Sequence, residues 1–256
     1  MRAASDPWFV TRKKKERPAL RLFCFPYAGG GPHIFSDWAD HLPDAVEVVG
    51  VRLPGRENRF RERPYRTWEP LTADLTALVR AKADAPFALF GHSLGGRIAY
   101  EVAKRLEASG REPARQVIVS GCRAPTTAQR QPPMYSMTTP DLRRRLHEMQ
   151  GVPAEILRNE NVMTLIEPTL RADLELAETW ASSPEPVAAP VAAFCGTRDA
   201  VDPPAAMRPW YRATTGRFDY AEFDGGHFFI HDHEAVVLAR IAGLLEQSIA
   251  EGRGHV

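Results

Sequence analysis

The chain has 256 residues, of which 44% are hydrophobic and 25% are charged, as expected of a globular protein with a sizeable core. Its 33 basic and 32 acidic residues give a formal net charge of +1, which argues against a dedicated nucleic-acid-binding protein. Its apolar runs all fall short of the roughly 18 residues of a membrane span, and no apolar segment of secretory length accompanies the basic run at 12–15.

The three cysteines, Cys24, Cys122 and Cys195, are too few and too scattered for a disulfide framework. Each lies in or just after an apolar run, which is typical of a small buried side chain. Pairs of cysteines or histidines with the spacing of a zinc site do not occur, so no metal is expected. The sequence therefore predicts a cytoplasmic protein that binds no metal, membrane or nucleic acid.

Six short apolar runs, rich in β-branched and aromatic residues, are predicted to be strands that are covered on both faces. In chain order they are 20–25, 46–53, 87–90, 116–120, 191–195 and 218–223. Helical spacing occurs between them, with an apolar residue at every fourth position of 94–106 and an apolar face on 234–249. This alternation predicts an α/β fold, with a mostly parallel central sheet and helices on both faces.

Residues 123–184 interrupt the alternation. They contain helical patterns at 142–149, 154–166 and 169–180, and stretches rich in proline, serine and threonine bracket them. We interpret this segment as a helical lid, inserted into a single core made of residues 1–122 and 185–256. Four of the six methionines lie in the lid, which suits either ordinary packing or a wall that adapts to varied apolar ligands: Met134, Met137, Met149 and Met163.

The segment Gly91-His92-Ser93-Leu94-Gly95 lies directly between a predicted strand and a predicted helix, which is the nucleophile-elbow pattern of serine hydrolases. A turn this sharp strains the backbone of the serine, and glycine two positions to either side avoids collisions between the strand and the helix. The helix that follows directs backbone N–H groups, and the positive end of its dipole, towards Ser93. We predict that Ser93 is a nucleophile.

A serine nucleophile needs a base, and the base needs an acid to orient it. In this architecture the partners follow in the order acid, then histidine, each just beyond a strand. Asp199 follows the strand at 191–195, and His227 follows the strand at 218–223. The alternatives are Asp202 and Asp224 for the acid, and His231 and His233 for the base. We prefer Asp199 because the loop at 121–125, after the preceding strand, offers no carboxylate. We prefer His227 because Gly225 and Gly226 leave it room to approach Ser93.

An oxyanion hole requires two donors, and the N–H of Leu94, directly after the nucleophile, is one candidate. The other is the N–H of Ala28, in the glycine-rich loop at 25–31. In the predicted mechanism, Ser93 attacks a carbonyl while His227 takes and then returns the proton. Asp199 holds the imidazolium, and water releases the acyl group.

With these motifs the chain resembles the external type II thioesterases of modular polyketide and nonribosomal peptide synthases, which belong to the α/β-hydrolase superfamily. The segments that carry the resemblance are 25–30 (FPYAGG), 53–57 (LPGRE), 91–96 (GHSLGG), 168–173 (PTLRAD) and 223–229 (FDGGHFF). The serine elbow is common to many hydrolases, whereas the PGRE segment and the GGHFF ending are more specific. The nucleophile, acid and base of the family fall on Ser93, Asp199 and His227.

The resemblance implies an α/β-hydrolase fold and an editing enzyme that needs no cofactor. Such an enzyme hydrolyses acyl or aminoacyl thioesters on the phosphopantetheine arm of acyl or peptidyl carrier protein domains. The chain contains no carrier-like segment, so the carrier would be a separate protein. We expect the enzyme to be a monomer. An arginine-rich stretch forms either a solvated face or a contact for the acidic carrier: Arg52, Arg56, Arg59, Arg61, Arg63 and Arg66.

Other functions share parts of this pattern. A carboxylesterase or an acyltransferase acting on small free esters or thioesters is the main alternative, and a peptidase is another. The esterase-type His-Gly-Gly-Gly loop does not occur, and a dehalogenase or epoxide hydrolase would need a carboxylate in place of Ser93. A binding module without activity would be expected to have lost Ser93, Asp199 or His227, and all three are present.

Overall fold

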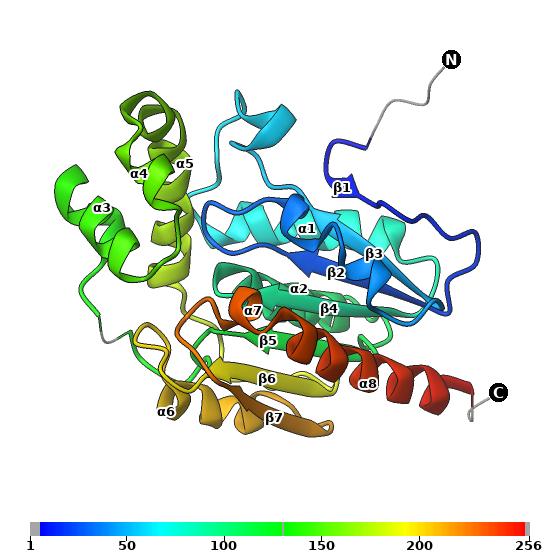
Figure 1. Cartoon of the computed structure of the whole chain (residues 1–256). Helices are drawn as coiled ribbons and strands as arrows, with labels where there is room; N and C mark the ends of the chain where they lie inside the picture. Colours follow the sequence, from blue (N-terminus) through cyan, green and yellow to red (C-terminus); the bar gives the residue numbers. More distant parts are fainter. Residues whose placement is uncertain (1–5, 130, 254–256) are drawn as a thin grey trace, which may run out of the picture.

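The computed structural model describes residues 6–129 and 131–253, and within them seven strands form one sheet in the order β1-β3-β2-β4-β5-β6-β7 (Figure 1). The strands are β1 Phe9–Val10, β2 Leu20–Phe25, β3 Val46–Val51, β4 Phe87–His92, β5 Gln116–Ser120, β6 Val191–Gly196 and β7 Phe218–Phe223. Strands β2 to β7 are parallel, and only β1 is antiparallel to its neighbour β3. The predicted α/β architecture with a mostly parallel sheet is confirmed.

The central strands read as unbroken apolar runs because both faces of the sheet are covered. In β2, Phe23 and Phe25 belong to one apolar cluster, whereas Leu22 and Cys24 belong to the cluster on the opposite face. Strand β1 has only two residues, which is too short to produce a recognisable pattern.

Helices α1 (Trp68–Lys82) and α2 (Leu94–Ala108) cover one face of the sheet, and α8 (Glu234–Arg253) covers the other (Figure 1). Leu75 of α1 and Ile98 of α2 pack in the first cluster, and Ile241 of α8 packs in the second. The short helices of the core are η1 Pro32–Phe35, η2 Trp38–Asp40, η3 Glu57–Arg59, α6 Pro204–Met207, η5 Arg208–Ala213 and α7 Phe229–Asp232. Helices on both faces agree with the sequence prediction.

The predicted lid holds η4 (Met134–Ser136), α3 (Thr139–Glu148), α4 (Ala154–Arg158) and α5 (Glu160–Thr179), which stand together beside the sheet (Figure 1). These elements share an apolar cluster of their own: Met134, Leu142, Leu146, Leu157, Met163, Leu170 and Leu174. The lid therefore has a small core of its own, while Leu176 and Ala177 of α5 pack in the main cluster of the sheet.

The helix boundaries in the lid differ from the prediction, which ended one helix at 166 and began the next at 169. In the structure α5 starts at Glu160, where the Asn159 side chain accepts a hydrogen bond from the N–H of Val162 (3.2 Å), and continues through Pro168. A proline removes the hydrogen bond that residue 168 would donate to the carbonyl of Thr164, and its ring crowds that carbonyl. Burial of Leu170 and of its neighbours on this helix outweighs that loss.

The three cysteines are buried and form no disulfide. Among the described residues, no group of three or more Cys, His, Asp or Glu side chains is placed to hold a metal ion. No helix in the described part of the chain has the length and apolar character needed to cross a membrane.

Candidate active site

The turn at Ser93 joins the end of β4 to the start of α2, and its backbone has φ +55° and ψ −116°. A Cβ atom on Gly91 would lie 1.9 Å from the carbonyl oxygen of Gly95, and one on Gly95 would lie 2.0 Å from the carbonyl oxygen of Phe25. Only glycine fits at these two positions, because the strand, the helix and the neighbouring strand meet there without space for a side chain. This close approach places Ser93 in the turn directly after the carboxyl end of β4.

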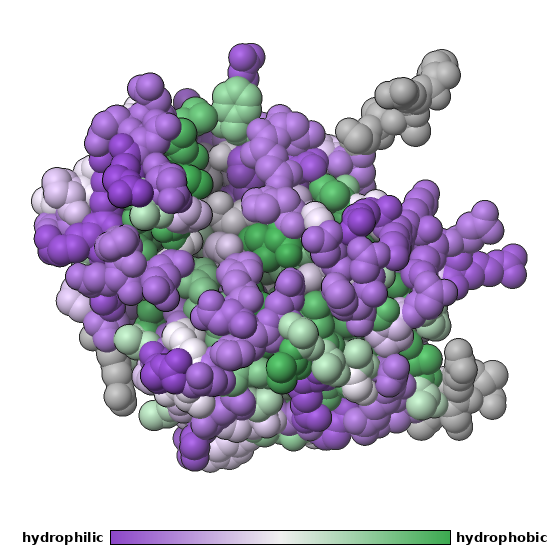
Figure 2. Space-filling view, in the orientation of Figure 1, coloured by the Kyte–Doolittle hydropathy of each residue, from purple (hydrophilic) through white to green (hydrophobic). Residues whose placement is uncertain are grey.

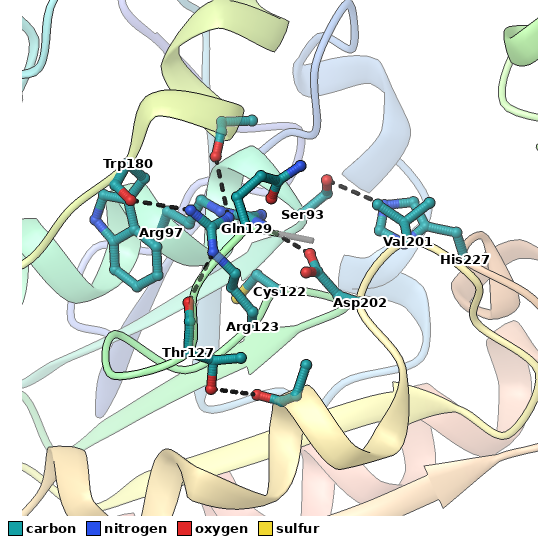
Figure 3. A network of polar contacts seen from close by, with 12 residues as sticks. Ser93, Arg97, Cys122, Arg123, Thr127, Gln129, Trp180, Val201, Asp202 and His227 are labelled. Atoms are coloured by element: carbon teal, nitrogen blue, oxygen red, sulfur yellow. Dashed lines mark hydrogen bonds and ion pairs between the residues drawn. The ribbon is translucent and has the colours of Figure 1, made fainter. Parts of the chain in front are cut away.

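Ser93, His227 and Asp199 form one hydrogen-bonded chain. The Oγ of Ser93 lies 3.1 Å from Nε2 of His227, and Nδ1 of His227 lies 2.8 Å from Oδ2 of Asp199 (the first contact is drawn in Figure 3). The other carboxylate oxygen of Asp199 accepts hydrogen bonds from the N–H groups of Val201 (2.8 Å) and Asp202 (3.0 Å). Because β4, β6 and β7 are parallel, the loops that follow them open at the same edge of the sheet and bring the three side chains together.

Burial and pairing act in opposite directions on the two ionisable groups. Burial raises the pKa of the Asp199 carboxyl, but the His227 charge and the hydrogen bonds that Asp199 accepts outweigh it, so this pKa lies below its ordinary value. Burial lowers the pKa of His227, but the charge and hydrogen bond of Asp199 outweigh it, so this pKa lies above its ordinary value. The arrangement therefore favours an imidazole that can take up a proton while its carboxylate partner stays ionised.

The alternative acids and bases have other partners. Asp202 pairs with Arg97 at 2.7 Å, and the exposed Asp224 pairs with Arg198. The Nε2 of His231 contacts the hydroxyl of Tyr27 at 3.1 Å. The remaining alternative is His233, whose carbonyl oxygen accepts the N–H groups of Val236 and Val237 at the start of α8. None of these four side chains is hydrogen-bonded to Ser93 or His227 in the described part of the chain.

The glycine-rich loop after β2 lies against the lid. The N–H of Gly29 donates to Oδ2 of Asp173 on α5 (2.8 Å), and the N–H of Gly30 donates to the carbonyl of Tyr27 (2.9 Å). The N–H groups of Ala28 and Leu94 have no acceptor among the described residues. The two predicted oxyanion donors are thus free to bind a ligand atom, and Ala28 borders the same cavity as Ser93.

Arg56 and Asp173 connect two segments that the sequence analysis had noted separately. The guanidinium of Arg56 donates two parallel hydrogen bonds of 2.9 Å to the carboxylate of Asp173, and Nη1 also donates to the carbonyl of Gly30 (2.8 Å). Both side chains are buried. The segments 53–57 and 168–173 therefore meet each other and the glycine-rich loop.

The arginine-rich stretch is not one uniform face. Arg56 and Arg59 are buried, and the guanidinium carbon of Arg59 lies 3.7 Å from the centre of a Trp8 ring. Arg52 pairs with Glu57 at 2.8 Å. The reading of the whole stretch as a solvated face or a carrier contact is therefore wrong for Arg56 and Arg59, which hold local structure.

Two cavities adjoin the glycine-rich loop. The smaller, of about 70 Å³, is bordered by Ser93, His227, Ala28 and residues of the lid, including three of its four methionines: Met134, Met137 and Met149. Met163, the fourth, packs inside the lid cluster. The larger, of about 540 Å³, lies between the same loop and the lid helices, and Figure 2 shows apolar side chains in the hollow between lid and core. Ala28 borders both cavities.

Comparison with known proteins identifies the family of this chain. A family model described as a thioesterase domain matches residues 20–246. The chain belongs to the thioesterase domain family. This thioesterase is 30% identical over 228 residues to the gramicidin S biosynthesis protein GrsT of Aneurinibacillus migulanus, a match that covers 89% of each chain.

Solved structures of thioesterases share its fold. The type II thioesterase BorB from the borrelidin biosynthetic cluster has a TM-score of 0.86 and 30% identity, covering 95% of this chain and 99% of its own. The thioesterase RedJ from the prodiginine pathway of Streptomyces coelicolor has a TM-score of 0.83 and 35% identity, covering 89% of this chain and 86% of its own. These likenesses confirm the α/β-hydrolase fold and the resemblance to type II thioesterases.

The sequence analysis of this thioesterase did not single out His92 or Arg97. His92 is fully buried beside His227, with 5.2 Å between the ring centres, and burial lowers its pKa far below the ordinary value, so it packs as a neutral ring. Arg97 lies one turn after Ser93 on α2 and has only 3% of its surface exposed. The available signal was its position four residues after the serine, in the first turn of the helix that follows the elbow, and both residues border one cavity.

Proposed function

We propose that this protein is an editing type II thioesterase that cleaves acyl or aminoacyl thioesters from the phosphopantetheine arm of carrier proteins. The observation that carries the proposal is the hydrogen-bonded chain Ser93–His227–Asp199 beside a lid cavity, in a member of the thioesterase family. The carrier belongs to a polyketide or nonribosomal peptide synthase. The enzyme acts in the cytoplasm as a monomer, and it requires only water as second substrate.

In the first half-reaction, Nε2 of His227 accepts the proton of the Ser93 hydroxyl as Oγ attacks the thioester carbonyl. The N–H groups of Ala28 and Leu94 donate hydrogen bonds to the oxyanion that develops on the carbonyl oxygen. Asp199 keeps the Nδ1–H tautomer and stabilises the imidazolium. The intermediate then collapses, and the departing pantetheine sulfur takes the proton from Nε2, which leaves an acyl-Ser93 ester.

In the second half-reaction, water approaches the acyl-Ser93 ester from the side of His227. Nε2 removes a proton from the water as its oxygen attacks the ester carbonyl, and the same two N–H groups hold the new oxyanion. Collapse of this intermediate returns the proton to Oγ of Ser93 and releases the free acid. The preference for water over another nucleophile distinguishes the hydrolase from an acyltransferase on the same fold.

The two cavities support a substrate that enters from outside. The larger cavity accommodates the pantetheine arm, because it runs along the glycine-rich loop to Ala28 and is lined mostly by apolar side chains. The smaller cavity accommodates the acyl group beyond Ser93. The similarity to GrsT of gramicidin S biosynthesis, BorB of the borrelidin cluster and RedJ of the prodiginine pathway favours this substrate over the small free esters of a carboxylesterase.

The test is intact-protein mass spectrometry of a panel of acylated carrier proteins incubated with the wild type or with Ser93→Ala. A free ester with the same acyl group is run beside each carrier. We expect rapid loss of acyl mass from the carriers that depends on Ser93, with slow cleavage of the ester. Fast ester cleavage with untouched carriers would instead make the protein a general esterase.

A further inference from the structure

The guanidinium of Arg97 has donors without a partner. One of its nitrogens, Nη2, donates to Oδ2 of Asp202 at 2.7 Å, but Nε and Nη1 are buried and have no hydrogen-bond partner among the described residues. The side chain lies between Trp180 and Asp202 on the same side of α2 as Ser93 (Figure 3). A charged group with unsatisfied donors is costly in a protein interior, which calls for an acceptor that the free protein lacks.

Two charged side chains near Arg97, those of Glu178 and Arg123, are engaged with backbone groups. The carboxylate of Glu178 accepts the N–H groups of Met134 (2.9 Å) and Tyr135 (3.1 Å). The second buried guanidinium nearby, that of Arg123, donates to the carbonyls of Thr127, Ala177 and Trp180. Arg97 differs from Arg123 in that it borders the small cavity, together with Ser93 and His227. An acceptor on a ligand in this cavity could therefore bind the free donors of Arg97.

We propose that Arg97 is a specificity-determining residue that binds an oxygen acceptor on a short acyl chain. This inference rests on the proposed thioesterase function. The acceptor is a ketone or carboxylate oxygen, since a guanidinium donates to both and carries no acceptor of its own. The substrate class is then the thioesters of short oxygenated acids, such as 3-oxoacyl or malonyl-type groups, in preference to saturated acyl groups of the same length.

The position of Arg97 and the volume of the small cavity both support a short acyl chain. The N–H of Arg97 donates to the carbonyl of Ser93 (3.4 Å) in the first turn of α2, and both residues border the small cavity, so the Arg97 side chain lies close to a carbonyl held at Ser93. The cavity of about 70 Å³ leaves room for few further atoms. Its walls combine apolar side chains, such as Met134 and Leu174, with the amides of Gln129 and Gln131 and with Arg145, which donates to Glu148 (3.3 Å). Arg97 adds buried donors that have no partner among the described residues, so an oxygen of the acyl group can bind there.

The experiment measures kcat/KM for three acyl groups on one carrier protein: butyryl, 3-oxobutyryl and malonyl. The same three are tested as thioesters of N-acetylcysteamine, so that acyl preference is read independently of the carrier. The variants are Arg97→Lys, which keeps a charge for Asp202 but loses the Nε and Nη1 donors, and the double variant Arg97→Met with Asp202→Asn, which leaves no buried charge unpaired. Asp202→Asn alone is the control that keeps the Arg97 donors.

We expect the ratio of oxygenated to butyryl kcat/KM to fall roughly tenfold to hundredfold in both Arg97 variants, as for a charge-assisted hydrogen bond, and to be kept in Asp202→Asn. A larger fall for malonyl identifies a carboxylate as the acceptor, and a larger fall for 3-oxobutyryl identifies a ketone. If all three substrates lose activity equally, Arg97 only supports the fold and the inference is overturned. Wild-type activity on the small thioesters with none on carriers would defeat the proposed function instead, while the ratio would still decide the role of Arg97.

Discussion

Arg56 and Asp173 form a buried, bidentate ion pair that joins the core to the lid helix α5 beside the candidate active site. The same carboxylate accepts the N–H of Gly29, the residue after the proposed oxyanion donor Ala28. The pair therefore fixes the backbone of the glycine-rich loop from two sides. It couples the position of the lid to the geometry in which an oxyanion would be bound.

Asp173→Asn should lower both the stability of the protein and its turnover. The substitution leaves the Arg56 charge buried without a counterion, which typically costs about 3–5 kcal/mol of unfolding free energy. Turnover should fall by about tenfold or more, because Gly29 loses its charged acceptor and the loop loses its anchor. Urea unfolding and the rate of thioester hydrolysis measure the two effects.

Glu175→Gln is the matched control for that substitution. Glu175 lies two residues further along α5 and pairs at 2.7 Å with Arg66, whose side chain is 67% exposed. Because exposed pairs contribute little, the free energy of unfolding should change by less than about 1 kcal/mol and turnover should stay near that of the wild type. Equal effects of the two variants would show that the buried pair has no special role.

Ser93→Ala should abolish hydrolysis while leaving the fold intact. Without Oγ no acyl-enzyme can form, and loss of the nucleophile costs at least about 10³-fold in turnover. The hydroxyl contributes one hydrogen bond, to His227, so the free energy of unfolding should change by less than about 1 kcal/mol. Thermal unfolding followed by circular dichroism checks the fold, and substantial turnover by the folded variant would remove Ser93 from the mechanism.

Much of the fold could be predicted because it leaves periodic or local signals. Strands that are covered on both faces appear in the sequence as apolar runs. The GxSxG turn needs glycine because a Cβ at either glycine would overlap backbone atoms. The loops that carry Asp199 and His227 follow strands of a parallel sheet, so their meeting at one edge could be expected.

The contacts of the lid could not be predicted in the same way. Arg56 and Asp173 are 117 residues apart, and a single charge pair at that separation produces no pattern in the sequence. Proline normally ends a helix, and only tertiary burial explains why α5 continues through Pro168. Arg97 stands in a polar position of the helical pattern and is buried because the lid and the loop of Asp202 close over it.

Alanine at either elbow glycine should prevent folding. The added Cβ of Gly91→Ala or Gly95→Ala would overlap backbone atoms, which cannot move aside as a flexible side chain can, so a loss on the order of 3 kcal/mol or more is expected. Gly243→Ala is the control, because its Cβ would meet nothing within 4 Å on the exposed face of α8. That variant should be more stable by about 0.5–1 kcal/mol. Soluble, active Gly91→Ala protein would contradict the close approach.

Asp199→Asn should lower turnover far more than Asp202→Asn. Asparagine at 199 cannot stabilise the imidazolium and can reverse the tautomer of His227, an effect on the order of 10⁴-fold in comparable triads. Asp202 pairs instead with Arg97, so its loss should chiefly lower stability. Rates on one thioester, together with unfolding free energies for both variants, separate the two roles. A larger loss of turnover in Asp202→Asn would transfer the role of acid to Asp202.

The pH dependence of kcat/KM should report the charge of His227. The base must be neutral to accept the Ser93 proton, so activity falls as the pH drops through the pKa of His227. Asp199 raises that pKa above the ordinary value of 6.5, so the midpoint of the acid limb should lie above pH 6.5. Asp199→Asn removes the negative charge and should move the midpoint to lower pH, whereas His147→Gln, at an exposed position of the lid, should leave it unchanged. A wild-type midpoint below 6.5, or one that Asp199→Asn does not move, would mean that the observed ionisation belongs to another group.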